Sequence, residues 1–438
     1  MINCQVIVVG AGIAGLVAAY QLKKNGITPV VLEASHRVGG RMISDCIEQY
    51  IMDAGAQFLS SGYPILSELI KEFGIEDEFV ETSRLVGIVR QGKIRKFRYD
   101  QPLSLLFGGL LNIKEWLAFC LASLRLLNKT KGLPLNNYSE WKNFDYEDSE
   151  TWSNGYYGSI ITEYFVEPML EAFYFQNPKE TSKALPIAIH SFSAHKPKTM
   201  TLVNGIGTLP ELIADKLDIK LNTPVHEISI KENEILVITA NQKYKADRVI
   251  LATPAPVSRR IYHSSNALER ELLKTSYSST VNVAIALKTK LARKSFEGIY
   301  GVWIPRKERQ VIAAFTIETA KDAGRAVTGE LIHVMLSGEA GKIMVKQDDE
   351  EIISTILQEL ELYLPYISEN VAFTKIYRWL NAEPKSHVGR SRNIYDYRSS
   401  INKHKKVILA GDYMRMPFTE GAAETGIWAA STILKNLT

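Results

Sequence analysis

The sequence is poor in the residues that build disulfide frameworks and metal sites. Its 438 residues include three cysteines, Cys4, Cys46 and Cys120, with no CxxC pair, and eight histidines with no HxxxH spacing. Disulfide scaffolds and structural zinc sites need paired or clustered ligands of these types. The composition therefore argues against a disulfide scaffold, predicts no metal site, and is typical of a reducing, cytoplasmic compartment.

The sequence also lacks an excess of one charge and a long uncharged hydrophobic run. Its 52 basic and 48 acidic residues leave a net charge of +4 without a basic block, so no nucleic-acid partner is expected. The most apolar stretch, Leu103 to Leu127, contains Lys114, Glu115 and Arg125, and so falls short of the ~20 uncharged residues of a membrane-spanning helix. Two short helices broken near Asn112 are expected. They form either a lid or core of a substrate domain, or a peripheral membrane contact.

What the sequence does contain is a strand, a glycine-rich turn and a helix at its beginning. The β-branched run Gln5–Val9 leads into the GxGxxG motif at Gly10–Gly15, without the basic region or cleavage site of a signal peptide. A helix at Leu16–Asn25 and a strand at Thr28–Leu32 follow. In such a unit the glycines allow a tight turn and close approach of a pyrophosphate to the helix N-terminus. Glu33, after the second strand, can accept ribose hydroxyls, which indicates an unphosphorylated adenosine.

The remaining pattern predicts an α/β protein in which strands and helices are interleaved. The expected elements are helices at Leu66–Phe73, Ser159–Phe175, Glu211–Leu217 and Glu350–Leu362, a hairpin at Leu85–Arg98, a loop from Asn136 to Gly158, and strands at Val225–Lys231, Ile235–Ala240, Arg248–Leu251, Thr280–Leu287, Val311–Thr316 and Leu331–Leu336. A second strand–glycine–helix pattern occupies Val407–Ser431, close to the end of the chain. No solenoid repeat is visible.

Two motifs after Glu33 distinguish FAD from NAD. Arg37–Met42 reads RVGGRM, and Asp53–Phe58 reads DAGAQF. Together with GxGxxG and the acidic residue, in this order and spacing, they resemble the flavin amine oxidase superfamily. That group includes monoamine oxidases, protoporphyrinogen oxidases and carotenoid-type desaturases. The resemblance continues to the final segment AGDYMRMPFTEGAAETG and implies an FAD-dependent oxidoreductase.

The resemblance implies a discontinuous organisation. A Rossmann-like FAD-binding domain of the GR2 type would be assembled from residues 1–80, 196–258 and 385–438. An α+β substrate domain would be formed by residues 81–195, which include the apolar helical insertion, and by residues 259–384. FAD is expected to be non-covalent, because the segment Lys385–Ser391, where covalent members have a cysteine, contains none.

The resemblance also assigns cofactor-binding residues by position. Val225 would hold the adenine through its backbone, Trp379 would lie beside the isoalloxazine, and the helix that begins at Thr419 would point its dipole at the flavin ring. Gly55 and Ala56 would offer a flat surface to that ring. The full set is Gly10, Gly12, Ile13, Ala14, Gly15, Glu33, Ala34, Arg37, Gly39, Gly40, Arg41, Gly55, Ala56, Gln57, Phe58, Val225, Thr253, Trp379, Gly411, Asp412, Thr419, Glu420, Gly421 and Ala422.

Departures from the amine-oxidase pattern favour another branch of the superfamily. The family lysine expected in Thr280–Ala284 is absent, Val283 takes its place, and Phe418 replaces a tyrosine. The segments Arg378–Gly389 and Glu163–Tyr174 instead resemble those of protoporphyrinogen oxidases.

Hydride abstraction from a bulky apolar substrate is therefore expected, with the flavin N5 as acceptor and with Trp379, His387 and Phe418 as candidates to line the site. An amine or amino-acid oxidase that releases imine and peroxide is the alternative. The sequence leaves the substrate, the electron acceptor and the oligomeric state open.

Overall fold

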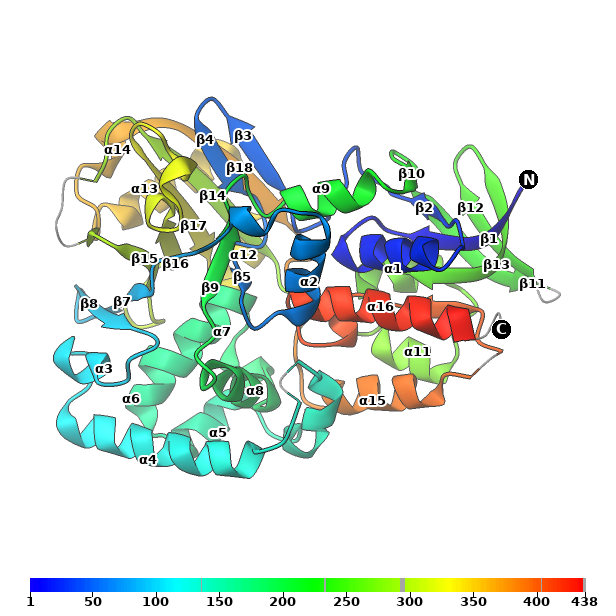
Figure 1. Ribbon diagram of the computed structural model, residues 1–438. Coiled ribbons are helices and arrows are strands. Elements are labelled where there is room, and N and C mark those ends of the chain that lie inside the picture. Colours follow the sequence, from blue (N-terminus) through cyan, green and yellow to red (C-terminus); the bar gives the residue numbers. More distant parts are fainter. Residues whose placement is uncertain (135, 232–233, 292–295, 403, 436–438) are drawn as a thin grey trace.

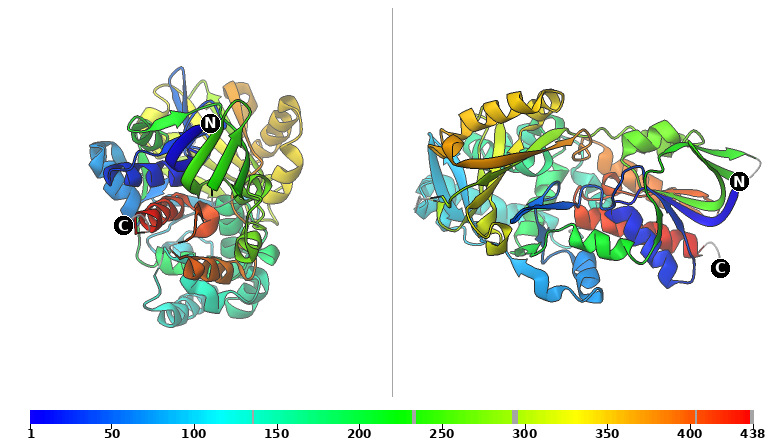
Figure 2. Two further views of the ribbon diagram at one scale, coloured as in Figure 1. Left: turned by 90° about the vertical axis from the view of Figure 1, so that its right-hand side faces the viewer. Right: turned by 90° about the horizontal axis from the view of Figure 1, so that it is seen from above.

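A computed structural model describes residues 1–134, 136–231, 234–291, 296–402 and 404–435. Two seven-stranded sheets form the framework of the molecule. The first lies beside both chain termini, and the second lies at the opposite end, above a group of helices from the first half of the chain (Figure 1). The right-hand view of Figure 2 shows the same separation from above.

The first sheet carries the predicted glycine motif. Its strand order is β10–β2–β1–β13–β12–β11, with β19 beside β13. Strands β10, β2, β1, β13 and β19 are parallel, and β11 and β12 are antiparallel. The strands are β1 (Ile2–Val9), β2 (Val30–Leu32), β10 (Asp218–Lys220), β11 (Val225–Lys231), β12 (Glu234–Thr239), β13 (Lys243–Leu251) and β19 (Val407–Leu409). Val6–Val9 are buried on both faces, which explains the uninterrupted apolar run in β1.

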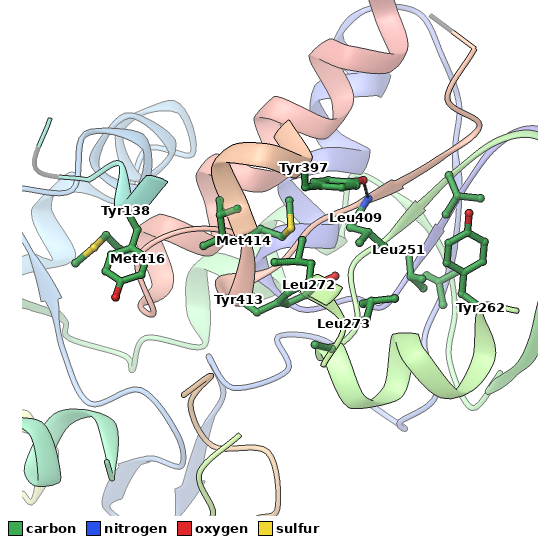
Figure 3. Close-up of a cluster of buried hydrophobic side chains, with 14 of the residues drawn as sticks. Tyr138, Leu251, Tyr262, Leu272, Leu273, Tyr397, Leu409, Tyr413, Met414 and Met416 are labelled. Carbon is green, nitrogen blue, oxygen red and sulfur yellow. Dashed lines mark hydrogen bonds between the residues drawn. The ribbon is translucent and has the colours of Figure 1, made fainter. Parts of the chain in front are cut away.

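Helices cover both faces of this sheet. On one face lie α1 (Ile13–Lys24), α2 (Pro64–Glu72), α9 (Thr208–Ala214) and α16 (Thr419–Lys435). On the other face lie α10 (Ala255–Ile261), α11 (Ala267–Leu272) and α15 (Arg390–Ser400). Figure 3 shows how Tyr397 and Leu272 close this second side, where the hydroxyl oxygen of Tyr397 accepts a hydrogen bond from the Leu409 amide at 3.0 Å. This bond fixes α15 to β19.

The second sheet has the order β18–β14–β17–β16–β15–β7–β8. Its strands are β7 (Leu85–Arg90), β8 (Lys93–Arg98), β14 (Thr280–Leu287), β15 (Ile299–Trp303), β16 (Ile312–Ile317), β17 (Glu330–Leu336) and β18 (Val371–Trp379). One face packs on α12 (Gly338–Met344), α13 (Asp349–Leu360) and α14 (Ile367–Asn370). The other face meets the short hairpin β3 (Ser44–Ile47) and β4 (Tyr50–Asp53) at one end. A three-stranded sheet, β5 (Leu59–Ser60), β9 (Thr199–Leu202) and β6 (Phe79–Glu81), joins the two parts.

The apolar stretch forms two helices, as predicted, α3 (Ser104–Phe107) and α4 (Ile113–Thr130). Asn112 begins α4 through a capping box with Glu115, because each side chain bonds the other's backbone N–H. Among the described residues, no helix combines the length and the apolar character needed to cross a membrane.

One prediction in the helical region is wrong. The expected loop Asn136–Gly158 contains a 3-10 helix, Tyr138–Phe144, and α5 (Ser149–Tyr156), because Asp148 caps α5 and Trp141 is buried. The expected helix Ser159–Phe175 is confirmed as a continuous helical segment, in which a π turn at Thr162–Val166 lies between α6 (Ser159–Ile161) and α7 (Glu167–Tyr174). The next helix along the chain is α8 (Ala184–Ser193).

Candidate active site

The predicted cofactor residues meet at the carboxyl ends of the parallel strands. Gly10 follows β1, Glu33 follows β2, Thr253 lies just beyond β13, and Gly411 lies just beyond β19. The Gly10 amide donates a hydrogen bond to the Leu32 carbonyl at 2.8 Å, with a φ of 101° that favours glycine. In open α/β sheets this edge is where ligands bind.

Space for a phosphate exists beside Gly12. A Cβ atom added to Gly12 would meet no atom within 4 Å, whereas one added to Gly15 would lie 1.9 Å from the Gly10 carbonyl oxygen. Gly12 precedes α1 without a side-chain cap, which leaves the N–H groups of the first turn, including those of Ile13 and Ala14, available to an anion. Gly39 and Gly40 border the same space, and the Gly39 amide bonds the Ala11 carbonyl at 2.9 Å.

The carboxylate of Glu33 is held in a fixed orientation. Its Oε2 accepts a hydrogen bond from the Ala11 amide at 2.7 Å, and Oε1 accepts one from the Ser35 amide at 2.8 Å. The Glu33 side chain is half-buried, and Ala34 is exposed. The Glu33 carbonyl also accepts the Thr223 amide at 2.7 Å, which brings Val225, the half-buried first residue of β11, near this edge.

The two arginines of the RVGGR motif have separate partners. Arg41 pairs with Asp412 at 2.5 Å, and the buried Asp412 also accepts a hydrogen bond from the Tyr277 hydroxyl at 2.8 Å. Arg37 pairs with Asp45, also at 2.5 Å, at a cavity of about 440 Å³ that Trp379 helps to line. Only Arg41 therefore joins the segments at the beginning and end of the chain.

Asp53, the first residue of the DAGA element, belongs to a buried ionic cluster. Its carboxylate contacts Lys321 at 2.6 Å and Arg325 at 3.0 Å, and Lys321 also contacts Glu318 at 3.0 Å. Burial alone would raise the pKa of Asp53, but Lys321 and Arg325 hold that pKa well below its usual range. Ser44 donates to the same carboxylate at 2.7 Å. Asp53 thus links the hairpin β3–β4 to the second sheet.

Backbone packing requires a glycine at position 55, because a Cβ there would lie 2.3 Å from the Arg41 carbonyl oxygen. Its expected role beside the flavin ring stays a prediction. The Ala56 amide bonds the same carbonyl at 2.9 Å. Gln57 donates to the Asp53 carbonyl at 2.7 Å, and its buried Oε1 has no hydrogen-bond partner. Phe58 makes an edge contact with Phe173 of α7, with ring centroids 5.5 Å apart.

The structure also corrects which residue of β14 faces this element. Val283 packs in the core against α13, on the far face of the sheet. Asn282 faces the cofactor side, where its Nδ2 donates to the Ala54 carbonyl at 3.2 Å. Trp379 donates from Nε1 to the same carbonyl at 2.9 Å, and its place beside the flavin ring stays a prediction.

The last segment of the chain, from Gly411 onward, borders the site on the side of the first sheet. The Gly411 amide donates to the Thr425 hydroxyl at 2.8 Å, which ties the turn after β19 to α16. α16 begins at Thr419, and Gly421 and Ala422 lie in its first turn. Phe418 stacks on Tyr63, with ring centroids 5.1 Å apart and planes 9° from parallel.

The side chain of Glu420 faces away from this turn. Its carboxylate accepts the amides of Ile65 and Leu66 at 2.9 and 3.0 Å and so caps α2. Burial raises the pKa of Glu420 to about 7. A cofactor contact at this position is therefore left to the backbone.

His387, the third candidate, is half-buried and stays a prediction. Burial lowers its pKa, and its charged neighbours include Asp145 and Arg390, which donates a hydrogen bond to the Asp412 carbonyl at 2.9 Å. The sequence analysis missed Glu383, whose Oε2 is buried without a hydrogen-bond partner. Burial raises the pKa of Glu383 well above its ordinary value although the neighbouring Arg41 lowers it. The only sequence signal for Glu383 was its acidic side chain between Ala382 and Pro384, in a segment that contains other predicted site residues.

These residues fit FAD. The open space at Gly12 and the uncapped start of α1 suit a pyrophosphate, the fixed Glu33 carboxylate suits a ribose, and the space around Ala54 contains unpartnered polar atoms of Gln57 and Asn282. Of the three cysteines, all unpaired, none lies in these segments, so the pattern is that of a non-covalent site.

Known proteins are similar to this chain in sequence and in fold. The sequence profile of flavin-containing amine oxidoreductases matches residues 13–434. The coproporphyrinogen III oxidase of Staphylococcus aureus is 24% identical over 441 residues, which cover 91% of this chain and 92% of that protein. An L-amino acid dehydrogenase of Synechocystis is 26% identical over 279 residues, which cover 60% of this chain and only 58% of that protein.

Among solved structures, cyclohexylamine oxidase from Brevibacterium oxydans superposes with a TM-score of 0.80 at 17% identity, covering 99% of both chains. That likeness shows the fold. The profile match over nearly the whole chain shows more, because from Ile13 onward it includes the other segments that border the site. The chain belongs to the flavin-containing amine oxidoreductase family, whose cofactor is FAD and whose enzymes are oxidoreductases.

Proposed function

We propose that this protein uses non-covalent FAD to abstract hydride from a bulky, largely apolar substrate, in a dehydrogenation of the porphyrinogen-oxidase or desaturase kind. The supporting relative is the coproporphyrinogen III oxidase, whose match extends over 92% of its length. The FAD-binding domain would comprise residues 1–80, 196–258 and 385–438, and the substrate domain residues 81–195 and 259–384.

In the proposed complex the pyrophosphate lies on Gly12 and the first turn of α1, and Arg41 adds a positive charge from the opposite side. Glu33 accepts the ribose hydroxyls, and the start of α16 faces the flavin. FAD supplies the hydride acceptor of the reaction. The chain has to bind and orient the substrate and to keep water away from it. Trp379 and Phe418 are the aromatic side chains proposed for that task.

The observation that carries the choice of substrate is the apolar character of the second sheet beside the site. Backbone pairing places Asn282, Met335, Ala314 and Trp303 side by side across four strands, and none of the four is charged. From α7, Phe173 packs on Trp303 with ring centroids 5.3 Å apart. Ala314 and Met335 also pack with Ala172 of α7, so the row forms an apolar layer between the second sheet and α7. Such an apolar wall supports a large apolar substrate and offers no charged group to a small amine.

Anaerobic bleaching of the bound flavin tests the proposal. The purified protein is expected to carry flavin absorbance, and a porphyrinogen or a polyene is expected to bleach it in the absence of oxygen. Bleaching by simple amines or amino acids alone would instead establish the alternative oxidase, to which the L-amino acid dehydrogenase relative points. A protein that remains colourless after incubation with FAD would refute both functions.

We also propose that this protein contacts a membrane surface through α3 and α4. Its unpaired cysteines favour the cytoplasm as its compartment. These helices lie along one edge of the molecule (Figures 1 and 2). Their outward side chains are unusually apolar: Leu103, Phe107, Ile113, Leu117, Leu121 and Leu124 are all exposed, Phe107 by 82%. Ile113, Leu117, Leu121 and Leu124 follow one face of α4, while Leu126 faces the protein. Such a face is typical of helices that lie in a membrane interface.

Charge distinguishes a membrane from a second copy of the chain. Every exposed charged side chain between Gln101 and Lys131 is basic, namely Lys114, Arg125, Lys129 and Lys131. The one acidic residue, Glu115, is half-buried and occupied in the cap of α4. Two copies of this face would bring basic groups together, whereas anionic headgroups neutralise them.

Vesicle sedimentation tests this contact. The protein is expected to bind vesicles that contain anionic phosphatidylglycerol and to bind pure phosphatidylcholine vesicles much less. The variant Leu117→Ser/Leu121→Ser is expected to lose binding, and the matched control Ile343→Ser/Leu362→Ser, at equally exposed positions elsewhere, to retain it. Absence of binding by the unmodified protein, or equal binding by both variants, would refute the contact.

A further inference from the structure

Asn282 is a buried polar residue in the mostly aliphatic strand β14. It lies near the middle of β14 and is 2% exposed. Its Nδ2 donates to the carbonyls of Ala54 at 3.2 Å and Gly55 at 3.5 Å, but its buried Oδ1 has no hydrogen-bond partner among the described residues. A buried acceptor without a donor destabilises the folded chain, because the bond it made with water is not replaced.

The neighbours of Asn282 do not account for the amide. Across the sheet it lies between Tyr377 of β18 and Met335 of β17. The Tyr377 hydroxyl donates to Asp45 at 2.9 Å, and the Trp379 indole already donates to the Ala54 carbonyl. These two nearby donors are therefore occupied, and Ala54 would keep a partner without Asn282. Leucine, of nearly the same size, would fit this row without leaving an unsatisfied atom.

We infer that Asn282 is a positioning residue of the loaded site, whose Oδ1 accepts a hydrogen bond from an N–H or O–H group that arrives with the ligands. The donor belongs to FAD, to the substrate, or to a water molecule held between them. The Ala54 carbonyl orients the carboxamide for this purpose by binding its Nδ2. The inference rests on the proposed FAD-dependent function, and it adds a neutral acceptor to an otherwise apolar wall.

The variant Asn282→Leu separates this role from a structural one. Leucine removes Oδ1, which is the proposed acceptor and is also unsatisfied in the FAD-free protein. The melting temperature of the FAD-free protein is therefore expected to change by no more than about 2 °C. The dissociation constant of FAD, measured by quenching of its fluorescence, is expected to rise about 5- to 30-fold, as the loss of one buried hydrogen bond implies. The visible spectrum of the bound flavin is expected to shift.

Thr280→Val is the matched control. Thr280 lies on the same strand and face and donates to the Leu336 carbonyl at 3.1 Å, so both atoms of this bond are satisfied within the protein. Its loss is expected to lower the melting temperature of the FAD-free protein and to leave FAD affinity within about twofold. If the donor belongs to the substrate, Asn282→Leu will instead leave FAD affinity unchanged and raise the KM of the bleaching substrate.

Three results would overturn the inference. If Asn282→Leu changes neither FAD affinity, nor the flavin spectrum, nor KM while the unmodified protein binds FAD, then Asn282 has no positioning role and the proposed function is unaffected. If the unmodified protein binds no FAD, the proposed function and the inference fail together. A loss of stability in the FAD-free Asn282→Leu protein as large as in Thr280→Val, with unchanged ligand affinity, would identify Asn282 as purely structural.

Discussion

Replacing Glu420 by glutamine should make the stability of this protein less sensitive to pH. The carboxylate of Glu420 is 1% exposed and accepts the Ile65 and Leu66 amides at the start of α2. Burial raises the pKa of Glu420 from 4.5 to about 7, although both hydrogen bonds favour the charged form. Glu420 therefore binds a proton more readily in the folded protein than in the unfolded chain.

The sign and size of the effect follow from this difference. A raised pKa in the folded state stabilises the protein below about pH 4.5, and this stabilisation is lost as the pH rises through about 7. At about 1.4 kcal/mol per pH unit, the unmodified protein loses roughly 2–3 kcal/mol between pH 5 and 8 through this one group. Glu420→Gln keeps one acceptor oxygen and does not titrate. The weaker cap should cost the variant about 1 kcal/mol, a constant loss to which the pH-dependent difference is added.

The assay is the apparent melting temperature of both proteins, loaded with FAD, from pH 5 to pH 8. The melting temperature of Glu420→Gln relative to the unmodified protein should rise by about 3 °C across this range, given typical unfolding entropies for a chain of this length. Glu211→Gln, at an exposed position in the first turn of α9, serves as the control and should leave the difference constant. Parallel curves for Glu420→Gln and the unmodified protein would refute the reasoning.

Three further predictions concern single contacts. Gly12→Ala should leave the melting temperature of the FAD-free protein within about 2 °C, since its Cβ meets no atom, yet weaken FAD binding about tenfold or more in equilibrium dialysis; unchanged affinity would contradict the phosphate site. Gly426→Ala should cost about 1–3 kcal/mol of unfolding free energy in urea titrations, because its Cβ would lie 2.3 Å from the Ala14 carbonyl oxygen; an unchanged midpoint would show that α1 and α16 can separate. Lys321→Met should lower the unfolding free energy by about 3–5 kcal/mol in the same titrations, because Arg325 alone would then neutralise Asp53 and Glu318. Adding Asp53→Asn should restore part of this free energy, and additive losses in the double variant would exclude the cluster.

The local sequence pattern was sufficient to predict the elements whose structure depends on residues close by in the sequence. The run Val6–Val9, the glycine turn and α1 form as predicted, because burial on both faces and backbone geometry both act within a few residues. The break of the apolar stretch at Asn112 was also predictable, since its capping box needs only Asn112 and Glu115. The failures are those of longer range. Trp141 turns an expected loop into helix by burial against distant elements.

Side-chain direction at the site was the harder prediction. Along β14 alone, Val283 and Asn282 are equally plausible occupants of the cofactor side, because successive residues alternate between the two faces. Pairing with β17 and β18 and the core beneath α13 decide in favour of Asn282. Glu420 shows the same limit. Its position in the last motif suggested a cofactor contact, but α2, more than 350 residues earlier in the chain, provides the amides it binds.

The sequence by itself determined the shape of the phosphate turn, because its glycines and acidic residue act within one βαβ unit. It also indicated the cofactor class, through the RVGGRM and DAGAQF motifs that follow this unit and resemble those of flavin enzymes. The tertiary structure alone decided which atoms the site presents. It paired Arg41 with Asp412, enclosed Asp53 in an ionic cluster, and left Asn282 with an unpartnered oxygen. These contacts join residues hundreds of positions apart, and their free energies depend on burial and orientation, which arise only when the two sheets come together.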